Sequence, residues 1–232
     1  EMKKLFVGVL CVALSLSVQG KEVNMTSPDG KYQFTLSDSG GQLHYSLTWN
    51  GKQTVKPSLL GINANVEWRD GVEIGTVDSS RKDTIWHPVY GERSEIKDCY
   101  HAWKIVVNRQ NGRDKLILDV RAYDEGIAFR YHFPGGQYLK ITDEYTEYTM
   151  PEGTKAYFTP KAQTPYSYLP LENWPGESDR PLLLTLADGG YVCLAEAQVV
   201  DYVRTKFNVS PTKKNTIISA MYGPVEDIAP YS

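Results

Sequence analysis

The sequence predicts an all-β fold, a large antiparallel sandwich of two sheets. Apolar residues recur mostly at every second position, and turn dipeptides separate these runs. After residue 20, no stretch shows the periodicity of an amphipathic helix of three turns. Because many antiparallel elements leave an apolar face uncovered, we expect a second sheet to pack against the first.

The expected strands fall into three groups that are joined by short turns. The turn Asn50-Gly51 is the strongest hairpin signal, because both residues tolerate positive φ. Asn111-Gly112 and residues 124–126 join the strands of a meander, and residues 187–190 close another hairpin. The strands themselves are expected at 44–49 and 52–55, then at 103–107, 115–123 and 127–133, and finally at 182–186 and 191–194.

The stretch from Thr159 to Arg180 breaks this alternation, because four prolines lie among its aromatic residues. We expect a long loop here. Loops of this length are usually functional or disordered, and aromatic side chains argue against disorder. Since flat aromatic rings stack on sugars, Tyr168 and Trp174 are the candidate substrate-binding residues.

Composition narrows the class of protein. The 232 residues carry a net charge of −3 and no basic block, so nothing in the sequence favours a nucleic-acid partner. Sixteen tyrosines and five tryptophans fit both a β fold and a carbohydrate site. We expect one globular domain over residues 21–232, with no linker that divides it.

Residues 1–20 resemble a secretory signal peptide. Lys3 and Lys4 precede a short apolar run, and small residues follow at the spacing that signal peptidase requires. Glu1 stands before Met2 and is interpreted as an artefact. No later stretch approaches the roughly 20 apolar residues of a membrane span. We therefore expect a soluble protein without a membrane partner, periplasmic or secreted from a bacterium.

The cysteines leave two alternatives open. Cys11 lies in the signal peptide, where Leu10 before it disfavours a lipid attachment site. Cys99 and Cys193 fit no metal-binding spacing. They either form one disulfide in an oxidising compartment or lie in the core as two small hydrophobic residues, and the second alternative is slightly favoured.

Self-contained catalytic motifs are missing from the sequence. There is no nucleophile elbow, phosphate-binding glycine loop or zinc-binding motif, and the four histidines are dispersed. Carboxylates are what glycosidases need, but 28 acidic residues make counting uninformative. Glu172 and Glu177 lie in the irregular aromatic stretch, where a hard cation finds free oxygen ligands. Glu196 follows an apolar strand and either approaches a ligand or caps that strand.

Several phrases occur in an order that resembles the N-terminal domain of glycoside hydrolase family 97. They are Ser27-Pro28-Asp29-Gly30, residues 86–92 (WHPVYGE), residues 121–131 (RAYDEGIAFRY), and the run from Asp188-Gly189-Gly190-Tyr191 through Glu196-Ala197 to Val200-Asp201-Tyr202. Each phrase alone is weak, but together they cover nearly the whole chain after the signal peptide.

The resemblance implies a galactose mutarotase-like β-super-sandwich that packs on a catalytic (β/α)8 barrel. The barrel is absent from this chain and would carry the catalytic carboxylates, so no catalytic residue is assigned here. The implied protein is an exo-α-glycosidase, an α-galactosidase or α-glucosidase, that hydrolyses oligosaccharides. The resemblance also implies a calcium ion to which this domain contributes one glutamate, Glu172 by position or Glu177 as the second choice.

Two alternatives remain at this point. A stand-alone carbohydrate-binding module of the same fold would grip sugar with the aromatic stretch alone. A mutarotase-like epimerase would need a histidine and a glutamate that converge on a concave sheet face, which the dispersed histidines disfavour.

Overall fold

A computed structural model describes residues 20–110, 112–135, 138–200 and 202–221. These residues form antiparallel strands joined by turns, and the only helical segments among them are two short 3-10 turns. The signal peptide expected at 1–20 lies almost entirely outside the described residues, as do Cys11 and Asp201. No helix of the described part has the length and hydropathy needed to cross a membrane.

The strands follow one another closely along the chain. In order they are β1 (Glu22–Thr26), β2 (Tyr32–Ser37), β3 (Leu43–Trp49), β4 (Lys52–Leu60), β5 (Ile62–Ala64), β6 (Val66–Glu67), β7 (Val72–Trp86), β8 (Ile96–Arg109), β9 (Lys115–Tyr123), β10 (Gly126–His132), β11 (Ile141–Glu144), β12 (Glu147–Thr149), β13 (Lys155–Phe158), β14 (Ser167–Pro170), β15 (Leu182–Thr185), β16 (Tyr191–Leu194), β17 (Thr205–Val209) and β18 (Thr216–Met221). The 3-10 turns are η1 (Ser39–Gly41) and η2 (Leu171–Asn173).

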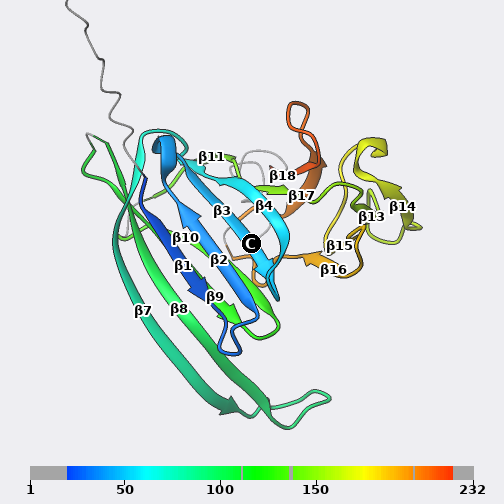
Figure 1. The fold of residues 1–232 in the computed structure, drawn as a ribbon, viewed down its shortest axis with the longest axis horizontal. Helices are drawn as coiled ribbons and strands as arrows, with labels where there is room; N and C mark the ends of the chain where they lie inside the picture. The colour runs from blue at the N-terminus through cyan, green and yellow to red at the C-terminus, as the bar shows by residue number, and fades with distance from the viewer. Residues whose placement is uncertain (1–19, 111, 136–137, 201, 222–232) are drawn as a thin grey trace, which may run out of the picture.

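Two large sheets make the sandwich that the sequence predicts. A seven-stranded sheet has the order β1-β2-β3-β4-β12-β18-β17, and a four-stranded sheet has the order β10-β9-β8-β7. Strands β1 to β4 lie across the second sheet (Figure 1). A three-stranded sheet, β11-β5-β6, and a four-stranded sheet, β14-β13-β15-β16, complete the fold, with the latter on one side of the sandwich (Figure 1).

The tight turns form where local sequence demands them. Asn50 and Gly51 adopt φ values of 50° and 75°, and Trp49 pairs with Lys52 across the turn. Positive φ at both central residues gives the turn a twist that matches the strands it joins. The predicted β3–β4 hairpin, the β8–β9–β10 meander and the β15–β16 hairpin are all confirmed, with β8 beginning earlier than expected, at Ile96.

The core lies between the two large sheets and extends beneath the small four-stranded sheet. Alternate residues of β9 are fully buried, and the same is true of β2 and β15, so each of these strands turns one face inward. The buried side chains form one cluster, which includes Phe34, Leu36, Tyr45, Ile105, Leu118, Val120, Ala156, Leu184 and Phe207. A single cluster that all these strands share favours one cooperative domain.

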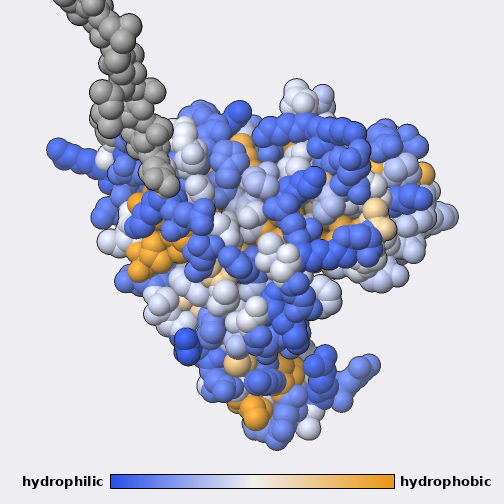
Figure 2. Space-filling view, viewed as in Figure 1, coloured by the Kyte–Doolittle hydropathy of each residue, from blue (hydrophilic) through white to orange (hydrophobic). Residues whose placement is uncertain are grey.

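Strands β7 and β8 continue beyond the sandwich as a two-stranded ribbon (Figure 1). From Ser79 to Trp86 every residue of β7 is exposed, so this half of the ribbon lacks a covering sheet. At its far end Ile85, Trp86, Val89 and Tyr90 are between 50% and 99% exposed. Figure 2 shows hydrophobic side chains gathered over this end of the ribbon.

Two expectations need correction. The stretch 159–180 is not one long loop, because Ser167–Pro170 forms β14 and pairs with β13. The sheet tolerates Pro170 because β14 is an edge strand that ends there. Cys99 and Cys193 are both free, which excludes the disulfide, but Cys193 is exposed instead of buried. It pairs with Leu183 on the outward face of β16.

Replacement of Leu118 by alanine tests the position of the core. Leu118 is fully buried between the two large sheets, so we expect a loss of about 2–5 kcal/mol in the free energy of unfolding. Leu183→Ala is the matched control, because Leu183 is 37% exposed and should lose less than about 1 kcal/mol. Urea unfolding measures both values, and equal losses would contradict this assignment of the core.

Candidate functional site

An exposed face rich in tyrosine covers the small sheet β14-β13-β15-β16. Register pairs Tyr157 with Tyr168 and places Tyr191 opposite Thr185. Tyr157, Tyr168 and Tyr191 are 38%, 49% and 72% exposed, and Leu183 lies outward on the same sheet. We call Tyr157, Tyr168, Tyr191 and Leu183 the tyrosine face.

Contacts within the tyrosine face hold its rings in place. The ring centroids of Tyr157 and Tyr168 are 4.9 Å apart, with 35° between the ring planes. The Tyr168 hydroxyl and the Thr185 hydroxyl share a hydrogen bond of 2.7 Å, and the Lys155 ammonium lies 5.3 Å from the Tyr168 ring centroid. A fixed pair of exposed rings is the kind of surface on which apolar faces of sugar rings stack.

Trp174, the second aromatic residue singled out from the sequence, lies away from this face. Its ring packs edge-on against Phe158, with 5.3 Å between the centroids, and it borders the buried core. The indole Nε1–H is buried and has no hydrogen-bond partner among the described residues. Tyr168 is therefore exposed on the surface, whereas the Trp174 side chain packs against the core.

Glu172 and Glu177 follow β14 in the chain. Glu172 is the acidic residue of η2, where the Trp174 N–H donates to the Leu171 carbonyl. Glu172 is exposed and Glu177 is partly buried, and neither makes a hydrogen bond or ion pair with a described residue. Both carboxylates are therefore free to accept a ligand.

Calcium requires six to eight oxygen ligands, which sets a test for this region. Among the described residues there is no group of three or more Asp, Glu, His or Cys side chains that could hold a metal ion. The exposed Glu172 carboxylate is a suitable hard ligand, but it supplies one part of a coordination sphere. The described residues therefore do not form a complete calcium site, and Glu172 offers one exposed carboxylate as a ligand.

A carboxylate that the sequence did not indicate, Glu144, lies where β11 ends. Glu144 accepts hydrogen bonds from the Tyr202 hydroxyl at 2.7 Å and from the Thr146 hydroxyl at 2.8 Å. The Tyr131 hydroxyl accepts the Gly61 N–H at 3.0 Å and contacts the Thr146 hydroxyl at 3.0 Å. These contacts join β10, β11 and the segment before β17.

Burial governs the ionisation of this group. Removal from water raises the pKa of Glu144 above its usual value of 4.5, against the opposing effect of the hydrogen bonds from Tyr202 and Thr146. Burial also raises the pKa of Tyr202, and the nearby negative charge of Glu144 adds to that shift. Tyr202 therefore stays protonated and remains a donor to Glu144.

Two further carboxylates, Glu196 and Asp179, are paired with arginines. Arg180 pairs with Glu196, and both Glu196 oxygens accept the Thr205 N–H at 3.2 Å. Asp179 accepts the Arg180 N–H at 2.9 Å and lies 3.3 Å from the Arg204 guanidinium. Of the two alternatives for Glu196, these contacts favour the structural one: it ties the end of β16 to β17.

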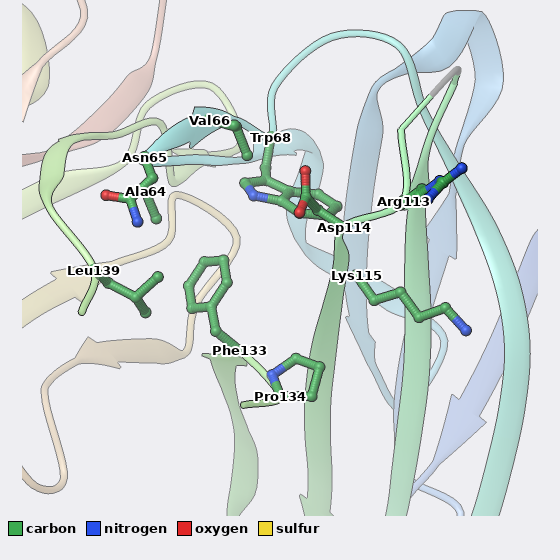
Figure 3. A pocket seen from close by; sticks show the side chains of 10 residues that line it. All are labelled: Ala64, Asn65, Val66, Trp68, Arg113, Asp114, Lys115, Phe133, Pro134 and Leu139. Carbon is green, nitrogen blue, oxygen red and sulfur yellow. The ribbon is translucent and has the colours of Figure 1, made fainter. Parts of the chain in front are cut away.

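A cavity of about 310 Å³ opens beside the start of β9 and the end of β10. Figure 3 shows Trp68, Phe133 and Leu139 around it, whereas the side chains of Arg113 and Lys115 extend away. Trp68 is only 1% exposed, and its ring meets Phe133 edge-on at 6.3 Å. The cavity wall is mixed, with Asn65, Arg113, Asp114 and Lys115 beside the apolar residues. Asp114 is the one carboxylate among the lining residues, whereas glycoside hydrolysis requires a pair.

The family model described as Glycosyl-hydrolase 97 N-terminal matches residues 25–224. The chain belongs to this family. The resemblance seen in the sequence is thereby confirmed, and the order of the matched phrases is explained by common descent over almost the whole described chain.

Known relatives of this GH97 N-terminal chain are longer proteins. The Retaining alpha-galactosidase of Bacteroides thetaiotaomicron is 25% identical over 244 residues, which cover 96% of this chain and 36% of that protein. A variant of a Glycoside Hydrolase Family 97 enzyme from Pseudoalteromonas sp. strain K8, solved in complex with panose, superposes with a TM-score of 0.79 at 22% identity. The match covers 86% of this chain and 32% of that one.

A structure described as a beta-arabinopyranosidase matches with a TM-score of 0.77 at 22% identity, over 85% of this chain and 35% of that one. These structural matches establish the fold, and the predicted all-β super-sandwich is confirmed. Since this chain spans about a third of each relative, their activities belong to longer proteins than the one described.

Glu144→Gln tests the ionisation of this partly buried carboxylate. The folded protein holds the Glu144 proton to higher pH than the unfolded chain, so the native protein loses stability as pH rises from about 4.5 through the raised pKa. The variant lacks this loss, so its stability relative to the native protein should rise over that range. Urea unfolding at a series of pH values measures the difference.

The matched control for this experiment is Glu73→Gln, at an exposed position of β7. The interpretation is wrong if the Glu144→Gln difference is constant with pH, or if it falls as pH rises.

Proposed function

We propose that this GH97 N-terminal chain is part of a secreted exo-α-glycosidase, an α-galactosidase or an α-glucosidase, that hydrolyses oligosaccharides. The family match over residues 25–224 carries the proposal. It is supported by the 25% identity to an enzyme named Retaining alpha-galactosidase and by related structures whose descriptions name panose and acarbose. Secretion to the periplasm or beyond rests on the signal-like residues 1–20.

The division of labour within such an enzyme follows from the chemistry. Glycoside hydrolysis needs two carboxylates on opposite sides of the scissile bond. In the described part of this chain Glu196 and Asp179 are paired with arginines, and Glu144 is enclosed by hydroxyl donors. We therefore assign the reacting carboxylates to a (β/α)8 barrel outside this chain, on which the sandwich packs.

Within the proposed enzyme, Glu172 contributes one carboxylate to a calcium site shared with the barrel. Its exposure and its lack of a described partner support this role, and Glu177 is the second choice. Bound calcium would polarise and orient the sugar. The role of this chain is to hold the Glu172 carboxylate in a fixed position. It can do so because η2 directly follows β14 and is anchored by the buried Leu171.

One observation favours a second function, a carbohydrate-binding module. The tyrosine face offers rings that are exposed and held by contacts with their neighbours, so it could bind an oligosaccharide without a barrel. Tyr168 is common to both functions, because it is the predicted substrate-binding residue and also a member of this face.

The activity of the longer protein tests the leading proposal. The polypeptide that carries this chain together with its barrel should release nitrophenol from a nitrophenyl α-galactoside or a nitrophenyl α-glucoside. It should also remove single terminal sugars from an oligosaccharide. Initial rates and product chromatography measure both. Failure on every α-linked substrate would overturn the proposal.

The same enzyme tests the calcium ligand. Glu172→Gln should raise the calcium concentration needed for half-maximal activity by about tenfold, the effect of losing roughly 1.4 kcal/mol of binding. The matched substitution Glu177→Gln should leave it unchanged. Calorimetric titration of the metal-free enzyme with calcium measures the calcium affinity directly and provides an independent test of the ligand. Unchanged affinity in Glu172→Gln with a loss in Glu177→Gln would assign the ligand to Glu177.

A binding experiment with the chain tests the tyrosine face. Tyr168→Ala should weaken oligosaccharide binding about fivefold or more, since it removes a stacking ring worth roughly 1 kcal/mol. Tyr166→Ala is the matched control, because Tyr166 is 61% exposed but lies outside the face. Equal affinities of the two variants in calorimetric titrations would exclude the tyrosine face as a sugar platform.

A further inference from the structure

A groove lies where the edges of the two large sheets meet. Thr26 is the last residue of β1, the edge strand of the seven-stranded sheet, and Ser79, Ser80 and Arg81 belong to β7, the edge strand of the other sheet. Strands β1, β7 and β8 run side by side in this region (Figure 1). We call the hollow lined by Thr26, Ser79, Ser80, Arg81, His101 and Trp103 the edge groove.

The edge groove exists because the first sheet ends before the second does. Trp103 and His101 lie on the same face of β8 as Ile105, at alternate positions. Ile105 is fully buried under the first sheet, whereas Trp103 and His101 are only partly buried. The inward face of β8 therefore continues into the open, and an aromatic floor remains uncovered.

Register brings polar groups to this floor. Ser79 pairs with Trp103, and Arg81 pairs with His101, so these side chains lie beside one another in neighbouring strands. The Trp103 and His101 rings meet edge-on, with 6.0 Å between their centroids and 79° between their planes. The Trp103 indole thus packs against the His101 ring, and Ser79 lies beside it in the neighbouring strand.

The hydrogen bond of His101 fixes what its ring offers to a ligand. Its Nδ1 lies 2.9 Å from the Thr26 carbonyl oxygen, which only accepts, so Nδ1–H is the donor. In the neutral ring Nε2 is then an acceptor, and no described residue donates to it. The Arg81 guanidinium is exposed and has no ion pair or hydrogen bond with a described residue, so its five N–H donors remain available.

These groups match the chemistry of a sugar. A pyranose presents an apolar face that stacks on an aromatic ring, and hydroxyls that donate and accept at its edge. The groove has a volume of about 280 Å³, near the lower limit of roughly 300 Å³ for ligand pockets, so it suits one small ring. Arg81 is the one charged residue among those that line it, and Asp83 follows on the same face of β7, which disfavours an anion.

We propose that the edge groove binds one neutral pyranose unit of a carbohydrate. The Trp103 indole meets the apolar face of the sugar, Arg81 donates to its hydroxyls, and His101 Nε2 accepts from one of them. All residues of this site belong to this chain, so sugar binding at the edge groove does not depend on the enzymatic function proposed above.

The test is calorimetric titration of the full chain with methyl α-galactopyranoside and methyl α-glucopyranoside, with glucuronate and inorganic phosphate as comparison probes. Saturable binding of at least one neutral glycoside is expected. Arg81→Ala should weaken it about tenfold, the effect of losing one hydrogen bond from a charged donor. Arg93→Ala is the matched control, because Arg93 is exposed and lies outside the groove.

A second variant, Trp103→Leu, should abolish binding while circular dichroism shows that the fold is kept; if this variant unfolds, the Arg81→Ala and Arg93→Ala pair decides. Three outcomes overturn the proposal. The first is no saturable binding of either glycoside. The second is binding that Arg81→Ala leaves intact; if Tyr168→Ala then removes it, the sugar lies on the tyrosine face. The third is binding of glucuronate and phosphate alone, which makes the groove an anion site.

Discussion

Aromatic packing in the core, along the seven-stranded sheet and across to the opposite sheet, is the interaction on which this fold depends. Phe34 of β2 stacks on Tyr45 of β3 at 5.2 Å, and both meet Phe129 of β10 in the opposite sheet, at 6.4 and 5.8 Å. Tyr148 continues the series from Tyr45 to Phe207 in β17, with 6.4 and 6.0 Å between the centroids. Each pair contributes about 0.5–1.5 kcal/mol beyond the area it buries.

This packing also determines which residues reach the surface. In β13 and β15 Ala156, Leu182 and Leu184 join the buried cluster, so the alternate residues of the same strands point outward. The tyrosine face follows from that alternation. The edge groove has a related origin, because β7 and β8 extend beyond the strands that cover their inward face. Both candidate surfaces are therefore consequences of where the core ends.

Local sequence was sufficient to predict the β3–β4 and β15–β16 hairpins and the β8–β9–β10 meander, because their turns are determined locally. Strands such as β7, β13 and β17 were not located from the sequence. Asn50-Gly51 required a tight hairpin whatever the rest of the chain did. The expectation for 159–180 was wrong in part, since four prolines suggested a loop and an edge strand tolerates Pro170. Residues alternate between exposed and less exposed positions in β13, which contains Tyr157, and in β16, which contains Tyr191. Without a known partner strand, the sequence could not show that these tyrosines lie on the exposed face.

The carboxylate network lay beyond prediction for a different reason. Glu144 and Tyr202 are 58 residues apart in sequence, and they meet only when β11 and the segment before β17 pack together. Of this network the sequence indicated only Glu196, as a residue that either approaches a ligand or caps a strand. Glu172 was found by its position within a family resemblance. Its carboxylate is exposed and has no described partner, which is compatible with the proposed role of a ligand shared with a second domain.

The central proposal is that this chain is part of a glycosidase but does not perform the chemical step itself. The most direct measurement is turnover of aryl α-galactoside and aryl α-glucoside by the 232-residue chain alone, with calcium present. The account predicts release no faster than in buffer. Turnover that Glu144→Gln or Glu172→Gln abolishes would contradict it, because it would place a reacting carboxylate within this chain.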